Sequence, residues 1–212
     1  FPSVEEGFGL PITESLWFAK PCVCANFGAM AEVASRGGCL TVNTASAINL
    51  SEAIESLIFN PGIRHRLGTE AASLNIKTWK EYAKEILHVL EEKDRGVPFE
   101  NVRKLAYWAD HTSSYPSNSG IQRVTRCLGR ALQDIGVLLT PVKWDGGHKG
   151  LAPLSKEDIL HLEKWNGPKL EESGIETLEG GWLLIPELTT YLGPEGMSEI
   201  ISNNGFAPST AV

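Results

Sequence analysis

The sequence predicts an α/β fold with parallel sheets, arranged as two units. Short apolar runs typical of buried strands alternate with longer segments in which apolar residues recur every three or four positions, as on one face of a helix. In the second half a strand, a glycine-containing loop, a helix and another strand follow in the order of a parallel βαβ unit. Residues 93–104 interrupt the pattern with charge, Gly and Pro. We therefore expect units over 1–92 and 105–212, joined by a linker over 93–104.

After an opening turn, the first unit is expected to contain two short buried strands and three helices. These elements are strands at 21–25 and 38–43 and helices over 49–60, 63–75 and 78–92. Thr78 and Glu81 have the spacing of a capping box, in which two side chains satisfy free N–H groups at a helix start. Asn49 and Glu52 have the same spacing. The expected inner faces of the first and last helices are Leu50, Ile54, Leu57 and Ile58, and Trp79, Tyr82, Ile86, Val89 and Leu90.

The second unit is expected to contain strands at 105–110, 137–142 and 182–185. The segment SYPSNSG reads as a loop, and the residues after it read as a helix. The apolar stripe of that helix consists of Ile121, Val124, Leu128, Leu132 and Ile135. Arginines at positions 123, 126 and 130 fall at spacings of three and four, so they share a helix face. That face is either an ordinary solvated surface or a site for anionic acceptors.

The opening stretch FPSVEEGFGLPITE carries most of the functional signal. Gly7 and Gly9 let the backbone approach a ligand and adopt conformations closed to other residues. Pro11 suits the first turn of a helix, where its missing N–H costs nothing. A helix starting there directs its unpaired N–H groups and its positive dipole end at the turn, which is the geometry of an anion site. Phosphate is the expected anion.

Two glutamates flank this turn, Glu6 before it and Glu14 in the helix after it. Carboxylates would repel a bare phosphate, but they form charge-assisted hydrogen bonds with sugar hydroxyls. Phosphate held by the backbone and hydroxyls held by Glu6 and Glu14 together describe a nucleotide-sugar. The alternative reading is a capped helix start with solvated acidic side chains.

The segment EGFGLPITE resembles the E-x7-E motif of retaining glycosyltransferases with the GT-B fold, in which two Rossmann-like halves enclose the active site. The flanks agree, with FPS before the motif and KPCVCANFGAMAEVA after it, where the family has a strand and a Glu-Val loop. The likeness spans about residues 1–92. Two departures concern local loop shape: Lys20 stands where the family commonly has Gly, and Ala29 to Ala31 replace a loop that often carries Pro.

This resemblance implies roles for the residues of the motif. Glu6 would lie beside the donor sugar at the reacting carbon, as nucleophile or as electrostatic support. Glu14 would bind the ribose hydroxyls. The remaining donor-binding positions implied by the family are Gly7, Phe8, Gly9 and Leu10, whose amides would hold the diphosphate and the sugar.

The second unit resembles, through SGIQRVTRCLGRAL and the strand after it, the N-terminal half of another GT-B glycosyltransferase. In that family the first βα loop faces the cleft, which implies Gly120 and Arg123 as an acceptor loop. The chain would then join the C-terminal, donor-binding part of one module to the N-terminal part of a second. Both half-domains would be incomplete, since each lacks its other half and the chain starts with Phe inside an expected strand. We expect this piece to be inactive on its own.

Composition limits the class of partner. A net charge of −7 and a pI of about 5.3 argue against nucleic acid, because a protein that follows phosphates needs a basic surface. No run reaches the length of a membrane span and no signal peptide opens the chain, so a cytoplasmic protein is expected. Cys22, Cys24, Cys39 and Cys127 are expected to be free thiols, and the scattered histidines predict no metal site.

These observations predict a retaining glycosyltransferase that needs no metal or other cofactor. Its partners would be a nucleotide-sugar donor and a glycan or lipid-linked acceptor, with a role in surface polysaccharide or lipopolysaccharide assembly. Peripheral association with the inner face of the cell membrane is a further expectation. The alternative is a non-catalytic glycan-binding or scaffolding module within a tandem protein.

Overall fold

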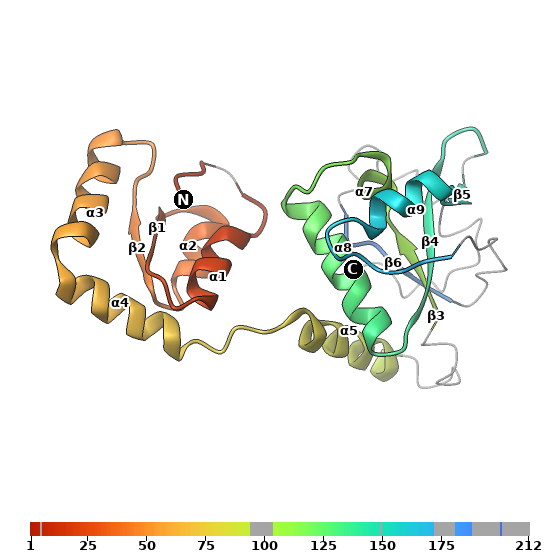
Figure 1. The fold of residues 1–212 in the computed structure, drawn as a ribbon, viewed down its shortest axis with the longest axis horizontal. Coiled ribbons are helices and arrows are strands. Elements are labelled where there is room, and N and C mark those ends of the chain that lie inside the picture. The colour runs from red at the N-terminus through yellow and green to blue at the C-terminus, as the bar shows by residue number, and fades with distance from the viewer. Residues whose placement is uncertain (5, 94–103, 149, 172–180, 188–199, 201–212) are drawn as a thin grey trace. The chain divides into compact units, whose positions relative to one another are not determined.

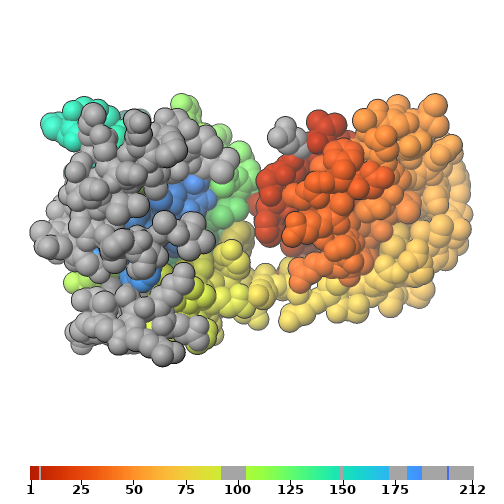
Figure 2. Space-filling model, turned by 180° about the vertical axis from the view of Figure 1, so that it is seen from behind, coloured from red at the N-terminus to blue at the C-terminus, as the bar shows by residue number. Residues whose placement is uncertain are grey.

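A computed structural model describes residues 1–4, 6–93, 104–148, 150–171, 181–187 and 200 (Figure 1). The chain divides into two compact units, Phe1–Ile76 and Lys77–Val212 (Figure 2). Buried apolar residues form separate core clusters in the two units. This boundary precedes the predicted helix at 78–92, so that helix packs with the second unit and not with the first. Except for its two end residues, the predicted linker at 93–104 lies outside the described residues. The assignment of the units to two glycosyltransferase modules stays a prediction.

The first unit is a small α/β assembly around a parallel pair of strands. Its elements are α1 (Leu10–Trp17), β1 (Cys22–Ala25), α2 (Gly28–Ala34), β2 (Cys39–Val42), α3 (Ala47–Phe59) and α4 (Pro61–Ser73). Both predicted strands are present, and β1 and β2 pair in parallel with Cys22 opposite Cys39 and Ala25 opposite Val42. Ile12 and Leu16 of α1 and Met30 of α2 are buried in the core beside β1.

Three local expectations for the first unit were wrong. Helix α3 starts earlier than predicted, because the Ser46 side chain caps it by accepting the backbone N–H of Asn49 at 3.3 Å. Its buried position is Ala53, whereas Ile54 and Ile58 are exposed, because α3 packs through its small residue. The expected Glu-Val loop is part of helix α2.

The second unit is built on a four-stranded sheet in the order β5-β4-β3-β6. Its elements are α5 (Trp79–Lys93), β3 (Lys104–Trp108), α7 (Asp110–Ser114), α8 (Gly120–Asp134), β4 (Leu138–Asp145), β5 (Gly150–Pro153), α9 (Lys156–Glu163) and β6 (Trp182–Leu184). Strands β4 and β6 both pair in parallel with β3, and β5 forms an antiparallel edge against β4. The predicted βαβ unit is therefore confirmed as β3-α8-β4, and the mixed α/β class with parallel sheets holds for both units.

Each face of this sheet has its own core, because successive strand residues point to opposite sides. Leu105 and Tyr107 face a cluster that includes residues of α5, α8 and α9. Ala106 and Trp108 face a smaller cluster that contains Ile200. Strand β3 ends at Trp108, so Asp110, which was expected to lie in the strand, is instead the first residue of α7.

Helix α5 begins as predicted, with the Glu81 carboxylate accepting the backbone N–H of Thr78 at 2.8 Å and the Thr78 hydroxyl accepting that of Glu81 at 3.2 Å. Its inner face differs from the prediction at two positions, since Tyr82 and Val89 are each 48% exposed. The residues that pack against the core of the second unit are Trp79, Ala83, Ile86, Leu87 and Leu90.

Candidate functional site

The turn before α1 has the geometry of an open helix start. Gly9 is the N-cap residue at φ 74° and ψ 40°, Leu10 is the first helical residue, and the Gly9 carbonyl accepts the N–H of Ile12 at 3.0 Å. No side chain of the described residues caps this end of the helix. Pro11, at the second position, has no N–H to satisfy. The amides at this end and the positive end of the helix dipole therefore face the turn.

Only one of the two motif glycines is required by the backbone. Gly9 lies in the left-handed region, which residues with a Cβ rarely adopt. A Cβ on Gly9 would also lie 3.4 Å from Cδ1 of Ile12 and 3.9 Å from Cγ of Met30. Gly7 is not among the described residues with positive φ, and a Cβ there would meet nothing within 4 Å. The same role was predicted for both glycines, but of the two only Gly9 has a backbone conformation that requires glycine.

The other predicted donor-site residues surround this turn. Glu6, Gly7 and Phe8 precede α1 and are exposed, with 61% of Phe8 open to solvent. Leu10 is half-buried at the start of the helix, and Glu14 is exposed in its second turn. The side chains that the sequence singled out are thus accessible to a ligand at this end of α1. The same exposure would suit solvated acids at a helix start.

A second loop, Asn26 to Gly28, lies beside this turn and was not predicted as part of the site. It follows the carboxyl end of β1, where the Asn26 N–H donates to the Val42 carbonyl at 2.9 Å. Gly28 has φ 61° and open space around it. The loop runs into α2, whose Met30 lies next to Gly9. Ligands of open parallel sheets bind at the carboxyl ends of the strands, and the turn and this loop both lie there.

In the second unit, Gly120 begins α8 and is exposed, with nothing within 4 Å of a Cβ placed on it. The helix start is ordered by Gln122, whose Oε1 accepts the backbone N–H of Ser119 and the hydroxyl of Ser117, both at 2.8 Å. Arg123 is half-buried one turn into the helix. The predicted acceptor-loop residues therefore lie at a helix start that is held by the hydrogen bonds of Gln122 and whose first residue is exposed.

Arg126 does not belong to an exposed arginine face. Its side chain is fully buried, and burial lowers the pKa of its guanidinium below the ordinary value. It donates from Nη1 to the Ser117 carbonyl at 2.8 Å and to Oδ1 of Asn118 at 2.9 Å. Arg130 forms an ion pair with Asp134 at 2.8 Å. Three arginines on one solvated or anion-binding face are therefore excluded, and Arg126 instead anchors the loop before α8.

The carboxyl ends of β3 and β6 meet at a carboxylate that the sequence did not reveal. Glu187, which follows β6, is buried and accepts the backbone N–H groups of His111 and Thr112, each at 2.8 Å. Burial raises the pKa of this carboxyl above its ordinary value. Strand β3 has β4 on one side and β6 on the other, so this is the switch point where open α/β sheets bind ligands.

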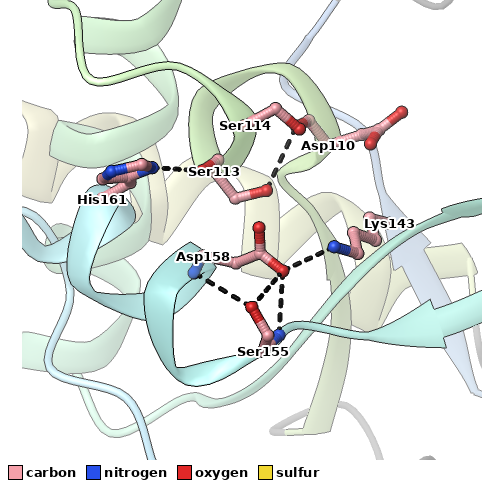
Figure 3. A network of polar contacts seen from close by, with 7 residues as sticks. All are labelled: Asp110, Ser113, Ser114, Lys143, Ser155, Asp158 and His161. Atoms are coloured by element: carbon pink, nitrogen blue, oxygen red, sulfur yellow. Dashed lines mark hydrogen bonds and ion pairs between the residues drawn. The ribbon is translucent and has the colours of Figure 1, made fainter.

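Polar contacts join α7 and β4 to α9 in the second unit (Figure 3). The Asp158 carboxylate accepts from Nζ of Lys143 at 2.5 Å and from the backbone N–H of Ser155 at 2.9 Å. His161 contacts the Ser113 carbonyl through Nδ1 at 2.8 Å. The His161 contact ties the end of α7 to α9, and the ion pair between Lys143 and Asp158 ties β4 to the start of α9.

The described residues contain no group of three or more His, Cys, Asp or Glu side chains arranged to hold a metal ion. None of their helices combines the length and apolar composition that crossing a membrane requires.

Comparison with known proteins gives one match. Residues 1–74 match the family described as "Glycosyl transferases group 1". No curated protein and no solved structure matches the chain. The matched segment contains the open turn at α1 and both strands of the first unit. It supports the GT-B superfamily and a glycosyl-transfer function, and it implies in general terms a nucleotide-sugar donor and a glycan acceptor. Residues 1–74 are thus similar to group 1 glycosyl transferases.

Proposed function

We propose that this chain is part of a retaining glycosyltransferase that moves a sugar from a nucleotide-sugar to a glycan or lipid-linked acceptor. The observation that carries the proposal is the turn at Gly9. This turn leads into the start of α1, which no side chain of the described residues caps. One exposed glutamate precedes the turn and another follows it in α1, and both lie within the segment that matches the group 1 family.

The donor is proposed to bind across this turn. The amides around Phe8, Gly9 and Leu10 would hold the diphosphate, because a helix start offers N–H donors and a positive partial charge. Glu14 would accept hydrogen bonds from the ribose hydroxyls, and Glu6 would lie beside the sugar. Gly7 would let the chain pass close to the donor.

In the proposed reaction the bond between the anomeric carbon and the diphosphate breaks, and the acceptor hydroxyl bonds to that carbon with retention. The amides at the start of α1 stabilise the negative charge that develops on the leaving diphosphate. Glu6 acts on the positive anomeric carbon, either as a nucleophile or as electrostatic support. No metal is assigned a role.

The second unit is proposed to begin another module of the same class, with Gly120 and Arg123 in its acceptor loop. Each module would lack its own other half, so the chain by itself would catalyse no transfer. A lipid-linked acceptor would draw the whole protein to the inner face of the cell membrane, where we place it in surface polysaccharide or lipopolysaccharide assembly.

The test is made in the full-length protein. Glu6→Gln and Glu14→Ala should each abolish or strongly reduce sugar transfer, with Glu14→Ala also weakening donor binding. Glu55→Gln, an exposed glutamate of α3, is the matched control and should leave turnover unchanged. The anomeric configuration of the product, read by NMR, tests retention.

Unchanged turnover in both motif variants would show that the first unit takes no part in catalysis. A chain that still bound glycans would then support the alternative, a non-catalytic glycan-binding or scaffolding module. Inversion at the anomeric carbon would contradict the retaining mechanism and leave glycosyl transfer intact.

A further inference from the structure

Three of the four cysteines gather on one face of the sheet in the first unit. Cys22 and Cys24 alternate along β1, so their side chains point to the same side. Cys39 begins β2 and is the register partner of Cys22 in the parallel pair. All are free thiols. The fourth cysteine, Cys127, lies on α8 in the second unit.

The three thiols interact with one another. The Cys22 thiol donates to the Val23 carbonyl at 3.6 Å, and the neighbouring thiols of Cys24 and Cys39 lower the pKa of Cys22 below its ordinary value. Cys22 in turn raises the pKa of both Cys24 and Cys39, so Cys22 is the thiol of the three that ionises first. Cys22 is 8% exposed and Cys24 is fully buried, whereas Cys39 is half-buried. A thiol that ionises readily next to a second thiol can be oxidised to a disulfide, and the half-buried Cys39 is the most exposed of the three.

Sheet geometry decides which pair can be joined. A disulfide needs Cα atoms about 4.4–6.8 Å apart. Neighbouring strands lie about 4.7–4.9 Å apart, which places the register partners Cys22 and Cys39 inside this range. Residues two apart on one strand are about 6.6 Å apart, so Cys22 and Cys24 are at the limit. The diagonal pair, Cys24 and Cys39, is about 8 Å apart and is excluded.

We propose that Cys22 and Cys39 form an oxidative modification site at which a hydroperoxide produces a disulfide between β1 and β2. Cys24 is the positioning residue of this site, because its side chain lies on the same side of β1 as that of Cys22. It stays reduced when the other two are joined.

The reaction balances in two steps. Cys22 releases its proton to solvent and its thiolate attacks the peroxide oxygen, so that an S–O bond forms, the O–O bond breaks and the departing alkoxide or hydroxide takes up one proton. The Cys39 sulfur then attacks the resulting sulfenic acid, forming the S–S bond and releasing the hydroxyl, which leaves as water with the Cys39 proton. Overall two thiols are oxidised by two electrons, and the hydroperoxide is reduced to an alcohol, or to water from hydrogen peroxide, and one further water.

The site is separate from the proposed donor turn. Cys22 lies at the amino end of β1, whereas the loop at Asn26 to Gly28 follows its carboxyl end. The proposal therefore does not rest on glycosyl transfer, and the two can fail independently.

The experiment uses the whole 212-residue chain, purified under reducing conditions and treated with hydrogen peroxide after the reductant is removed. Free thiols are then alkylated, and the chain is digested with trypsin without reduction. Cleavage after Arg36 separates Cys22 and Cys24 from Cys39, so the cross-link appears as two joined peptides. Fragmentation of the joined pair locates the bond at Cys22 or at Cys24.

We expect a Cys22–Cys39 cross-link, with Cys24 and Cys127 alkylated. Cys39→Ser should abolish the cross-link and leave a sulfenic acid on Cys22 that dimedone labels. Cys24→Ser should slow oxidation of Cys22 several-fold without moving the bond, whereas Cys127→Ser should change neither rate nor product. Alkylation of all four thiols after peroxide, or a bond from any other pair, would overturn the proposal. Mapping of the unsubstituted chain decides this even if a variant fails to fold.

Discussion

Arg126 of α8 donates two hydrogen bonds to the backbone carbonyl oxygen of His161 in α9, from Nε at 3.3 Å and from Nη2 at 3.0 Å. The guanidinium also lies over the Trp165 ring, 4.7 Å from its centroid. With its bonds to Ser117 and Asn118, one buried cation thus connects the loop before α8 to α9. Because hydrogen bonds from charged groups are strong and Arg126 itself is buried, we expect these contacts to contribute substantially to the stability of the second unit.

Replacing Arg126 should therefore destabilise the second unit. Arg126→Met keeps much of the side-chain volume but removes every donor, and we expect a loss of about 2–4 kcal/mol. The first unit should be unaffected. Hydrogen exchange, read separately over β1 and β3, measures this without assuming one cooperative transition.

Arg130→Met is the matched control on the same helix. Arg130 pairs with Asp134 at the surface, so its loss should cost less than about 1 kcal/mol. Equal effects of the two substitutions would contradict the buried role of Arg126.

Substitutions at Gly9 and Gly7 test the backbone conformation of the turn before α1. Gly9→Ala must place a Cβ at φ 74°, which costs about 1–2 kcal/mol, and should weaken donor binding in the full-length protein. Gly7→Ala meets open space and should be tolerated by the fold. Thermal unfolding and titration with nucleoside diphosphates give the two readouts. If Gly9→Ala left both unchanged, the turn would not need its observed conformation.

Glu187 gives the second unit a specific pH dependence. Burial raises its folded-state pKa, so the folded state holds a proton that the unfolded state has already released. Its stabilising contribution is then complete below the ordinary glutamate pKa and is lost as pH rises through the folded value. Glu187→Gln, which cannot titrate, should flatten the decline in stability above about pH 4.5. Exchange rates over β3 and β6 across this range measure the effect.

The exposed Glu157→Gln, at the start of α9, controls for general charge effects. This substitution should leave the decline in the stability of the second unit with rising pH unchanged. A decline that persists unchanged in Glu187→Gln would show that another group causes it.

Neighbouring positions on α5 test which unit this helix stabilises. Leu87 packs against the core of the second unit, whereas Val89 is 48% exposed. Leu87→Ala should cost about 2 kcal/mol and reduce exchange protection in β3 and α8. Val89→Ala should cost less than about 1 kcal/mol. Reduced exchange protection in β1 and not in β3 would instead show that α5 stabilises the first unit.

Several elements of the fold could be predicted because short-range rules control them. The start of α1 follows from a glycine that can adopt positive φ and from Pro11 in the first turn. The start of α5 follows from the side-chain bonds of Thr78 and Glu81, three residues apart. The order of strand, helix and strand in the second unit predicted its parallel pairing.

Two helix features were predicted wrongly, the start of α3 and the inner face of α5. Asn49 and Glu52 have capping-box spacing, but Ser46 caps α3 instead. Val89 fits the apolar period of α5 as well as Leu87 does, and only the packing against β3 and α8 separates them. Periodicity indicates that a helix has an inner face, but it does not fix that face to within one residue.

By itself, the sequence determined the α/β class, the parallel βαβ unit and the open turn with its two glutamates, because these depend on backbone sterics and on bonds within a few residues. Only the tertiary structure decided that Arg126 is buried, that Cys39 stands opposite Cys22 and that Glu187 reaches the N–H of His111 across 76 positions. A polar side chain is buried only where folding brings it partners, and those partners come from segments whose meeting no local pattern encodes.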